Sequence, residues 1–118
     1  MHRLFSHPAV GCLLAMLAAC APRAFLALEG DADTISRPEA VKRSMAGARP
    51  AYVLFGAENR LGVNYASHSH MFNADDWNAL LTFAAWHLFG IKPDRSFNRF
   101  QKDAELDSAL RRAPTSAK

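Results

Sequence analysis

Three residues that could carry out acid–base chemistry follow predicted strands. Asp33 comes after an apolar run at residues 24–28, and His68 and His70 come after a second apolar run. In a parallel sheet, functional groups gather in the loops beyond the carboxyl ends of the strands. An acid after one strand and a histidine after the next match the last two members of a triad in the chain order nucleophile, acid, histidine. In such a site the histidine takes a proton from a serine, and the acid fixes the tautomer of the imidazole.

The same residues leave other interpretations open. Asp33 could simply shape a turn, and a histidine in a loop is often only solvated. The side chains of His68 and His70 would point the same way in an extended segment, so that both could bind one metal ion. Catalytic zinc needs three protein ligands, and the further candidates are Asp75, Asp76 and His87. None of these stands out as a third ligand, so we expect neither a metal nor a cofactor.

The elements that would position Asp33 are a buried strand and a helix. Residues 24–28 (AFLAL) form a short apolar run that ends at the polar sequence EGD, as expected for a strand buried in a parallel sheet. Ser36 and Glu39 have the spacing of a capping box, which predicts a helix from Ser36 to about Ala46 that stops at Gly47. The apolar run at residues 51–55 (AYVLF) then predicts a second buried strand.

The elements that follow would position the two histidines. Residues 57–73 read as a long loop with a short strand within residues 61–65. Asn73 is typical of a helix N-cap, and two acidic residues follow in the first turn, where the helix dipole favours anions. The helix should end at Gly90 and bury one continuous apolar face at helical spacing, made up of Trp77, Leu80, Leu81, Ala84 and Leu88. Three aromatic residues widen that face, so the helix is expected to be buried on more than one side: Phe83, Trp86 and Phe89. The order strand, helix, strand, helix predicts an α/β fold with a mostly parallel sheet flanked by helices.

The ends of the chain divide it into three parts. Residues 1–20 are apolar, residues 21–100 contain the predicted elements, and residues 101–118 form a polar tail. The first part reads as a buried helix, with a signal segment or a lipoprotein anchored through Cys20 as the alternatives. Its apolar core is too short to span a bilayer, so no stable membrane span is expected. The net charge of +3 comes from scattered basic residues, which does not favour a nucleic-acid partner.

Three segments of the sequence are similar to the glucuronoyl esterases, which are serine carbohydrate esterases of the α/β-hydrolase fold. Residues 21–33 contain APRAFL followed by EGDAD, which resembles a strand and a Gly-x-x-Asp turn of that family. Residues 52–63 contain YVLFGA and LGV, which resemble the next strand and the approach to the histidine loop. Residues 70–84, HMFNADDWNALLTFA, resemble the histidine loop and the helix that follows it, and this match is the most specific.

The resemblance implies a C-terminal part of an α/β-hydrolase domain with His70 as the catalytic histidine, seven residues before Trp77. It places His68 where the family usually has glycine, so that a small residue there should be tolerated. The triad acid stays open between Asp33 and a residue on an earlier strand, as in many members of the family. Ester-linked uronic acid or another carbohydrate ester is the implied substrate, and a secreted or periplasmic location is implied as well. The nucleophile would lie upstream, because the chain contains no Gly-x-Ser-x-Gly.

We expect the chain alone to show no esterase turnover above background on a model aryl ester or a glucuronoyl ester. The reason is that the sequence offers no activated nucleophile. Spectrophotometric assay of the purified 118-residue chain checks this. Turnover that disappears in His70→Ala would contradict the expectation and point to an unrecognised serine.

Overall fold

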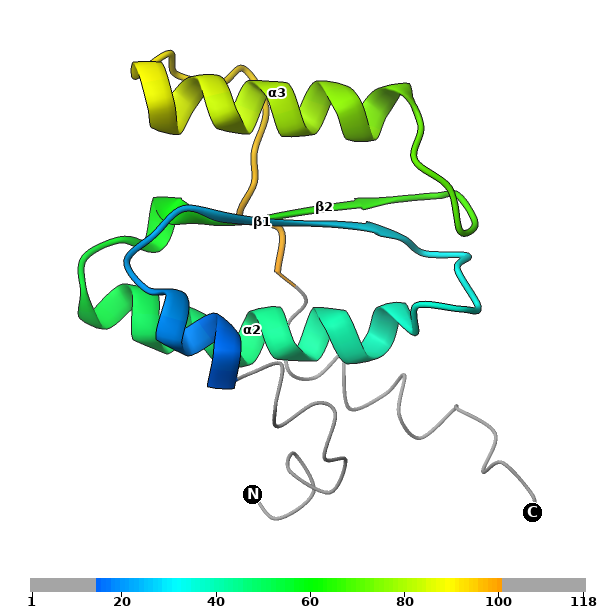
Figure 1. Ribbon diagram of the computed structural model, residues 1–118, viewed down its shortest axis with the longest axis horizontal. Helices are drawn as coiled ribbons and strands as arrows, with labels where there is room; N and C mark the ends of the chain where they lie inside the picture. Colours follow the sequence, from blue (N-terminus) through cyan, green and yellow to red (C-terminus); the bar gives the residue numbers. More distant parts are fainter. Residues whose placement is uncertain (1–14, 101–118) are drawn as a thin grey trace.

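Two parallel strands lie between helices in the computed structural model, which describes residues 15–100 (Figure 1). Residues 15–20 are helical and precede the first strand. The elements that follow are strand β1 (Phe25–Gly30), helix α2 (Pro38–Leu54), the 3-10 turn η1 (Glu58–Arg60), strand β2 (Leu61–Ala66) and helix α3 (Ala74–Phe89). The strands pair in parallel from Phe25 opposite Leu61 to Gly30 opposite Ala66. Helices α2 and α3 cover opposite faces of this pair (Figure 1), so the predicted α/β class with a parallel sheet is confirmed.

The strand predicted at residues 51–55 is wrong, because residues 51–54 belong to helix α2 and Phe55 is the C-cap of that helix. The helix continues through Gly47 and Pro50 to Leu54, and its buried residues follow a helical spacing rather than alternation. Tyr52 is fully buried, whereas the Leu54 side chain is 83% exposed. The Tyr52 hydroxyl donates to the carbonyl of Arg23 at 2.9 Å, which ties the last turns of the helix to the segment before β1. This packing outweighs the helix-breaking tendency of Gly47 and Pro50. The second strand of the sheet is instead the short strand expected within residues 61–65.

The capping box predicted at Ser36 is also absent. The N-cap position of α2 is Arg37, which has a left-handed backbone with φ 56° and no side-chain cap. The hydroxyl of Ser36 donates to the buried carboxylate of Glu29, and its backbone N–H donates to Asp33. Ser36 is therefore used by the turn after β1, and the helix starts two residues later at Pro38.

Helix α3 has the predicted ends. The Asn73 side chain accepts from the backbone N–H of Asp76 at 3.1 Å, and the Asp76 carboxylate accepts from the N–H of Asn73 at 3.0 Å. Gly90 closes the helix with φ 71°, a conformation that favours glycine. Both end signals are local in sequence, which explains why they were predictable.

The buried face of α3 differs from the predicted one. Its buried residues are Asp76, Ala79 and Phe83, of which only Phe83 belongs to the predicted apolar face, whereas the predicted residues Trp77, Leu81 and Leu88 are exposed. The Phe83 ring lies so close to the sheet that a Cβ at Gly62 would stand 2.7 Å from it. A small residue on the helix and a glycine on the strand allow this approach, so contact with the sheet selects the buried face rather than total hydrophobicity.

The core has two layers. One lies between α2 and the sheet and includes Met45, Tyr52, Leu61 and Val63, together with Leu17 of the first helical turns. The other lies between α3 and the sheet and consists of Ala79, Phe83 and Phe97. The division of the chain at residues 20 and 100 stays a prediction, and the polar tail at 101–118 lies outside the described residues.

Cys20 is half-buried at the end of the first helical turns and is a free thiol. Within residues 15–100, no helix combines the length and the apolar character that crossing a bilayer requires.

Replacing Tyr52 by alanine should lower the free energy of unfolding by about 3–5 kcal/mol, as is typical when a buried aromatic residue is removed. Leu54→Ala, two residues away, should change it by less than about 0.5 kcal/mol because the side chain is exposed. Urea unfolding followed by circular dichroism measures both. An equally large loss for Leu54→Ala would contradict the helical assignment of residues 51–54.

Candidate active site

The loops after β1 and β2 are joined by backbone hydrogen bonds that extend the pairing of the strands. The N–H of Asp31 donates to the carbonyl of Ala66 at 2.8 Å, and the N–H of Ala32 donates to the carbonyl of His68 at 3.1 Å. The two predicted site residues Asp33 and His70 follow directly, at the carboxyl edge of the sheet. Their side chains are therefore brought together across 37 residues of sequence.

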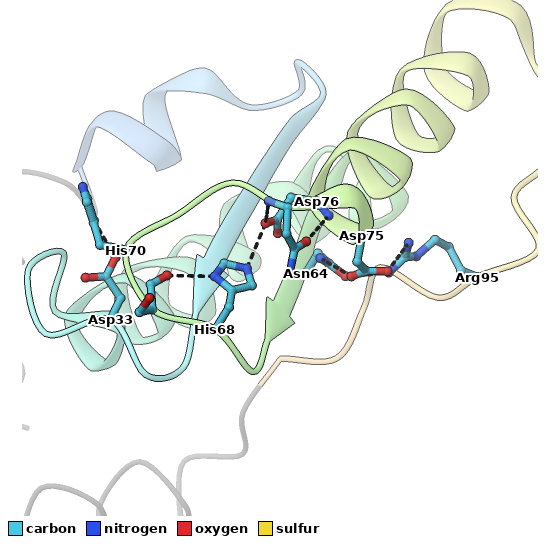
Figure 2. A network of polar contacts seen from close by, with 9 residues as sticks. Asp33, Asn64, His68, His70, Asp75, Asp76 and Arg95 are labelled. Carbon is cyan, nitrogen blue, oxygen red and sulfur yellow. Dashed lines mark hydrogen bonds and ion pairs between the residues drawn. The ribbon is translucent and has the colours of Figure 1, made fainter.

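The Asp33 carboxylate lies beside the ring of His70 (Figure 2). Its Oδ1 accepts from the backbone N–H groups of Ile35 at 2.8 Å and Ser36 at 3.1 Å, and its Oδ2 accepts from Nδ1 of His70 at 2.8 Å. Desolvation by burial raises the pKa of Asp33, but the hydrogen bonds from His70 and from the two amides outweigh it and hold the pKa well below its ordinary value. Asp33 is therefore a fixed negative charge in the neutral pH range.

His70 is exposed to solvent, in contrast to the buried Asp33. Its side chain is 61% exposed, although the ring is anchored to the buried Asp33. Because Nδ1 faces a carboxylate, the proton of the neutral ring sits on Nδ1, and the Nε2 lone pair is left as an acceptor. A buried acid behind a solvent-facing imidazole is the arrangement that makes the imidazole a general base.

His68 lies in the same loop but has different partners (Figure 2). Its side chain is 8% exposed, its Nδ1 lies 2.8 Å from the carbonyl oxygen of Ser69, and its Nε2 lies 2.8 Å from Oδ2 of Asp76. The hydrogen bond to Ser69 raises the pKa of His68, burial opposes this, and the Asp76 and Asp33 carboxylates raise it further. The sequence signal for this pair was the acid in the first turn of the next helix, which we assigned to the helix dipole and counted among the possible further metal ligands.

Each histidine thus has its own carboxylate. His70 is hydrogen-bonded to Asp33, and His68 lies at ion-pair distance from Asp76, so the two rings do not converge on one point. Among residues 15–100, no three His, Cys, Asp or Glu side chains come close enough together to hold a metal ion.

Gly30 is required at the end of β1 by the histidine loop. A Cβ on Gly30 would lie 2.3 Å from the carbonyl oxygen of His68, 2.7 Å from its Nδ1 and 2.8 Å from the carbonyl oxygen of Ser69. Such contacts are too short, and most of the atoms involved are backbone atoms that cannot rotate away. The glycine of the Gly-x-x-Asp turn is therefore there to let the loop that carries His70 lie directly on the strand.

A buried lysine fixes the same turn from the side of α2. Lys42 is almost fully buried, its Nζ lies 2.6 Å from Oδ1 of Asp31, and it stands over the ring of Tyr65. Burial raises the pKa of Tyr65, and the nearby carboxylates Glu29 and Asp31 add to the effect. The phenol is therefore neutral, and the Lys42–Asp31 ion pair holds the residue two positions before Asp33.

A second polar network anchors the first turn of α3. Arg95 donates to Asn64 at 2.7 Å, to Asn78 at 3.0 Å and to Asp75 at 3.2 Å. The hydrogen bond from Arg95 lowers the pKa of Asp75, and one from Asn64 adds to it. The segment after α3 thereby connects the helix to β2, and Figure 2 shows this network beside the His68–Asp76 pair.

The chain was compared with known proteins. No family model matches it, and no curated protein matches it. Among solved structures, it matches a carbohydrate esterase family 15 glucuronoyl esterase from Caldicellulosiruptor kristjansonii with 36% sequence identity and a TM-score of 0.73. The resemblance to the glucuronoyl esterases is confirmed. The match covers 80% of this chain but 26% of the esterase, so the chain spans about a quarter of the length of the protein it matches.

Gly30→Ala should lower the free energy of unfolding by about 1–3 kcal/mol, because the added Cβ forces the histidine loop off the strand. Gly47→Ala makes the same chemical change at an exposed position of α2 and should instead stabilise by about 0.5–1 kcal/mol. Urea unfolding of the two variants checks the difference. A stabilising Gly30→Ala would show that the loop does not rest on this glycine.

Proposed function

We propose that this chain is the part of a serine-type glucuronoyl esterase that supplies the catalytic histidine, His70, and its acid, Asp33. The proposal includes the α/β-hydrolase fold, in which this chain would form the C-terminal part of the domain. The observation that carries it is the 2.8 Å hydrogen bond between His70 and the buried Asp33 at the carboxyl edge of a parallel sheet. The 36% identity to a glucuronoyl esterase supports the substrate class, an ester of a uronic acid.

The roles of the two residues follow from their hydrogen bonds. Nε2 of His70 would accept the proton of a serine hydroxyl as the serine oxygen attacks the ester carbonyl, and it would then give that proton to the departing alcohol. Asp33 would keep Nδ1 protonated and stabilise the imidazolium that forms in between. The lowered pKa of Asp33 suits this task because the carboxylate stays ionised while the ring takes up its proton.

The nucleophile would come from the rest of the enzyme. The chain contains no Gly-x-Ser-x-Gly, and apolar side chains are exposed on both helices, among them Leu54, Phe55, Trp77, Leu81 and Leu88. Large apolar residues that are exposed in such number are typical of a chain that another part of a protein covers. They support a chain that works inside a larger esterase domain.

A chimera tests the function. Residues 15–100 would replace the matching segment of the Caldicellulosiruptor kristjansonii esterase, and hydrolysis of a methyl ester of glucuronic acid would be measured. His70→Ala in the chimera should lower kcat by roughly 10³-fold or more, because the general base is lost. Asp33→Asn should lower kcat by roughly 10²- to 10⁴-fold, because the amide cannot fix the tautomer or stabilise the imidazolium.

The control is His87→Gln, which changes a half-buried histidine of α3 that lies against Phe83 and Trp86, outside the site. It should change kcat by no more than a few-fold. An active chimera in which His70→Ala retains its full kcat would refute the assignment of His70.

A further inference from the structure

The imidazole of His68 is hydrogen-bonded through Nδ1 and lies at ion-pair distance from a carboxylate through Nε2. Nδ1 lies 2.8 Å from the carbonyl oxygen of Ser69, and Nε2 lies 2.8 Å from a carboxylate oxygen of Asp76. A carbonyl oxygen and a carboxylate oxygen can only accept. A ring that carries a proton on both nitrogens suits these two neighbours best, and it would be paired with a carboxylate that is almost fully buried.

The pair joins three parts of the molecule. The ring of His68 rests on the end of β1, where a Cβ at Gly30 would lie 2.7 Å from its Nδ1. Asp76 belongs to the first turn of α3, and its Oδ2 also accepts from the backbone N–H of Asn73 at 3.0 Å. One carboxylate oxygen therefore holds both the start and the end of the loop at residues 68–73.

His70 lies between these two fixed points. Its ring is mostly exposed, and Asp33 is the residue to which it hydrogen-bonds within the described part of the chain. An exposed side chain held by a single hydrogen bond keeps its orientation only if its backbone is held in place. The contacts that hold this backbone come from His68, through Asp76 and through the hydrogen bond between its carbonyl and the N–H of Ala32.

We propose that His68 is a positioning residue, whose ion pair with Asp76 closes the loop at residues 68–73 onto α3 and keeps His70 bonded to Asp33. The proposal rests on the proposed function for the role of His70, but the loop geometry that it describes can be measured without any catalysis. This proposal contradicts the expectation from the sequence that a small residue such as glycine would be tolerated at position 68. A glycine would leave the Asp76 carboxylate buried without its charged partner, which is strongly unfavourable.

The charges around His68 favour the imidazolium from each neighbouring element. Asp75 and Asp76 face it from α3, and Asp33 faces it from the turn after β1, with the exposed His70 next to it in its own loop. The pKa of His68 is raised, so the ion pair contributes stability that is fully present below the ordinary value of 6.5 and is lost as the pH rises through the raised pKa. Above that pH the ring is neutral, and the ion pair between His68 and Asp76 is lost.

The test uses nuclear magnetic resonance of the full 118-residue chain with 15N-labelled histidine. In the wild-type chain, the His68 ring should titrate above 6.5 with both nitrogens protonated at lower pH. At a fixed pH at which His68 is charged, the Nδ1–H of His70 should exchange slowly with solvent, and the variants are compared with the wild-type chain at that same pH. A His68 ring that titrates at or below 6.5 would overturn the proposal without the need for any variant.

Two matched variants distinguish the effect of the His68–Asp76 ion pair from the effect of an acidic charge on the helix dipole. Asp76→Asn keeps a side-chain oxygen for the N–H of Asn73 but removes the charge next to His68, so the His68 titration should shift down and the exchange of the His70 Nδ1–H should speed up roughly tenfold or more. Asp75→Asn removes the same charge from the same helical turn, yet Asp75 bonds to Arg95 and Asn64. It should leave the His70 exchange rate within about twofold, because the bond to His68 is intact. Equal effects of the two variants would overturn the proposal.

The chimera gives a separate readout. His68→Gly should lower kcat and leave KM unchanged, because the substrate contacts stay while the base loses its orientation. An active chimera in which His70→Ala has no effect would refute the proposed function, while a slow His70 exchange that depends on Asp76 would still establish the positioning role. Unchanged His70 exchange in His68→Gly would refute the positioning role alone.

Discussion

The parallel pairing of β1 with β2 is the constraint on which the site depends. The ladder that runs from Phe25–Leu61 to Gly30–Ala66 is continued into the loops by the N–H groups of Asp31 and Ala32. Parallel strands place their carboxyl ends at the same edge, so loops far apart in sequence must meet there. The register fixes which residues meet, because a shift of the ladder by one position would turn the side chains to the opposite faces. Gly30 completes the constraint, since only a residue without a Cβ allows the second loop to rest on the first strand.

Two histidines two residues apart receive opposite environments from this edge. His70 points to solvent with Asp33 behind it, whereas His68 is enclosed between the end of β1 and the start of α3. The exposed ring can exchange a proton with a substrate or a nucleophile. The enclosed ring gains a carboxylate and a carbonyl and is therefore best satisfied when it is charged. Burial, rather than residue type, distinguishes the proposed base, His70, from the proposed positioning residue, His68.

The two helices hold the loops at the carboxyl edge of the sheet through different contacts. Helix α2 brings Lys42 to Asp31 and so holds the turn that carries Asp33. Helix α3 uses its first turn, where Asp76 caps the helix and pairs with His68 while Asp75 bonds to Arg95. Acids in a first turn are expected from the helix dipole alone. In this molecule they also connect the helix to the loop and to the segment that follows it, so a local preference is used for tertiary contacts.

The sequence by itself determined the features that depend on neighbours along the chain. These include the strand before Asp33, the Asn73 cap and Gly90 end of α3, and the order of acid and histidine after successive strands. It could not assign residues 51–55 correctly, because AYVLF is apolar enough for a strand or a helix and only the contact of Tyr52 with the segment before β1 decides between them. It could not identify the partner of His68 either, because Asp76 reaches the ring only once α3 packs on the sheet through Ala79 and Phe83. Local signals are encoded in short stretches, whereas the choice of buried face and of ion-pair partner is a property of surfaces that exist only after the chain has folded.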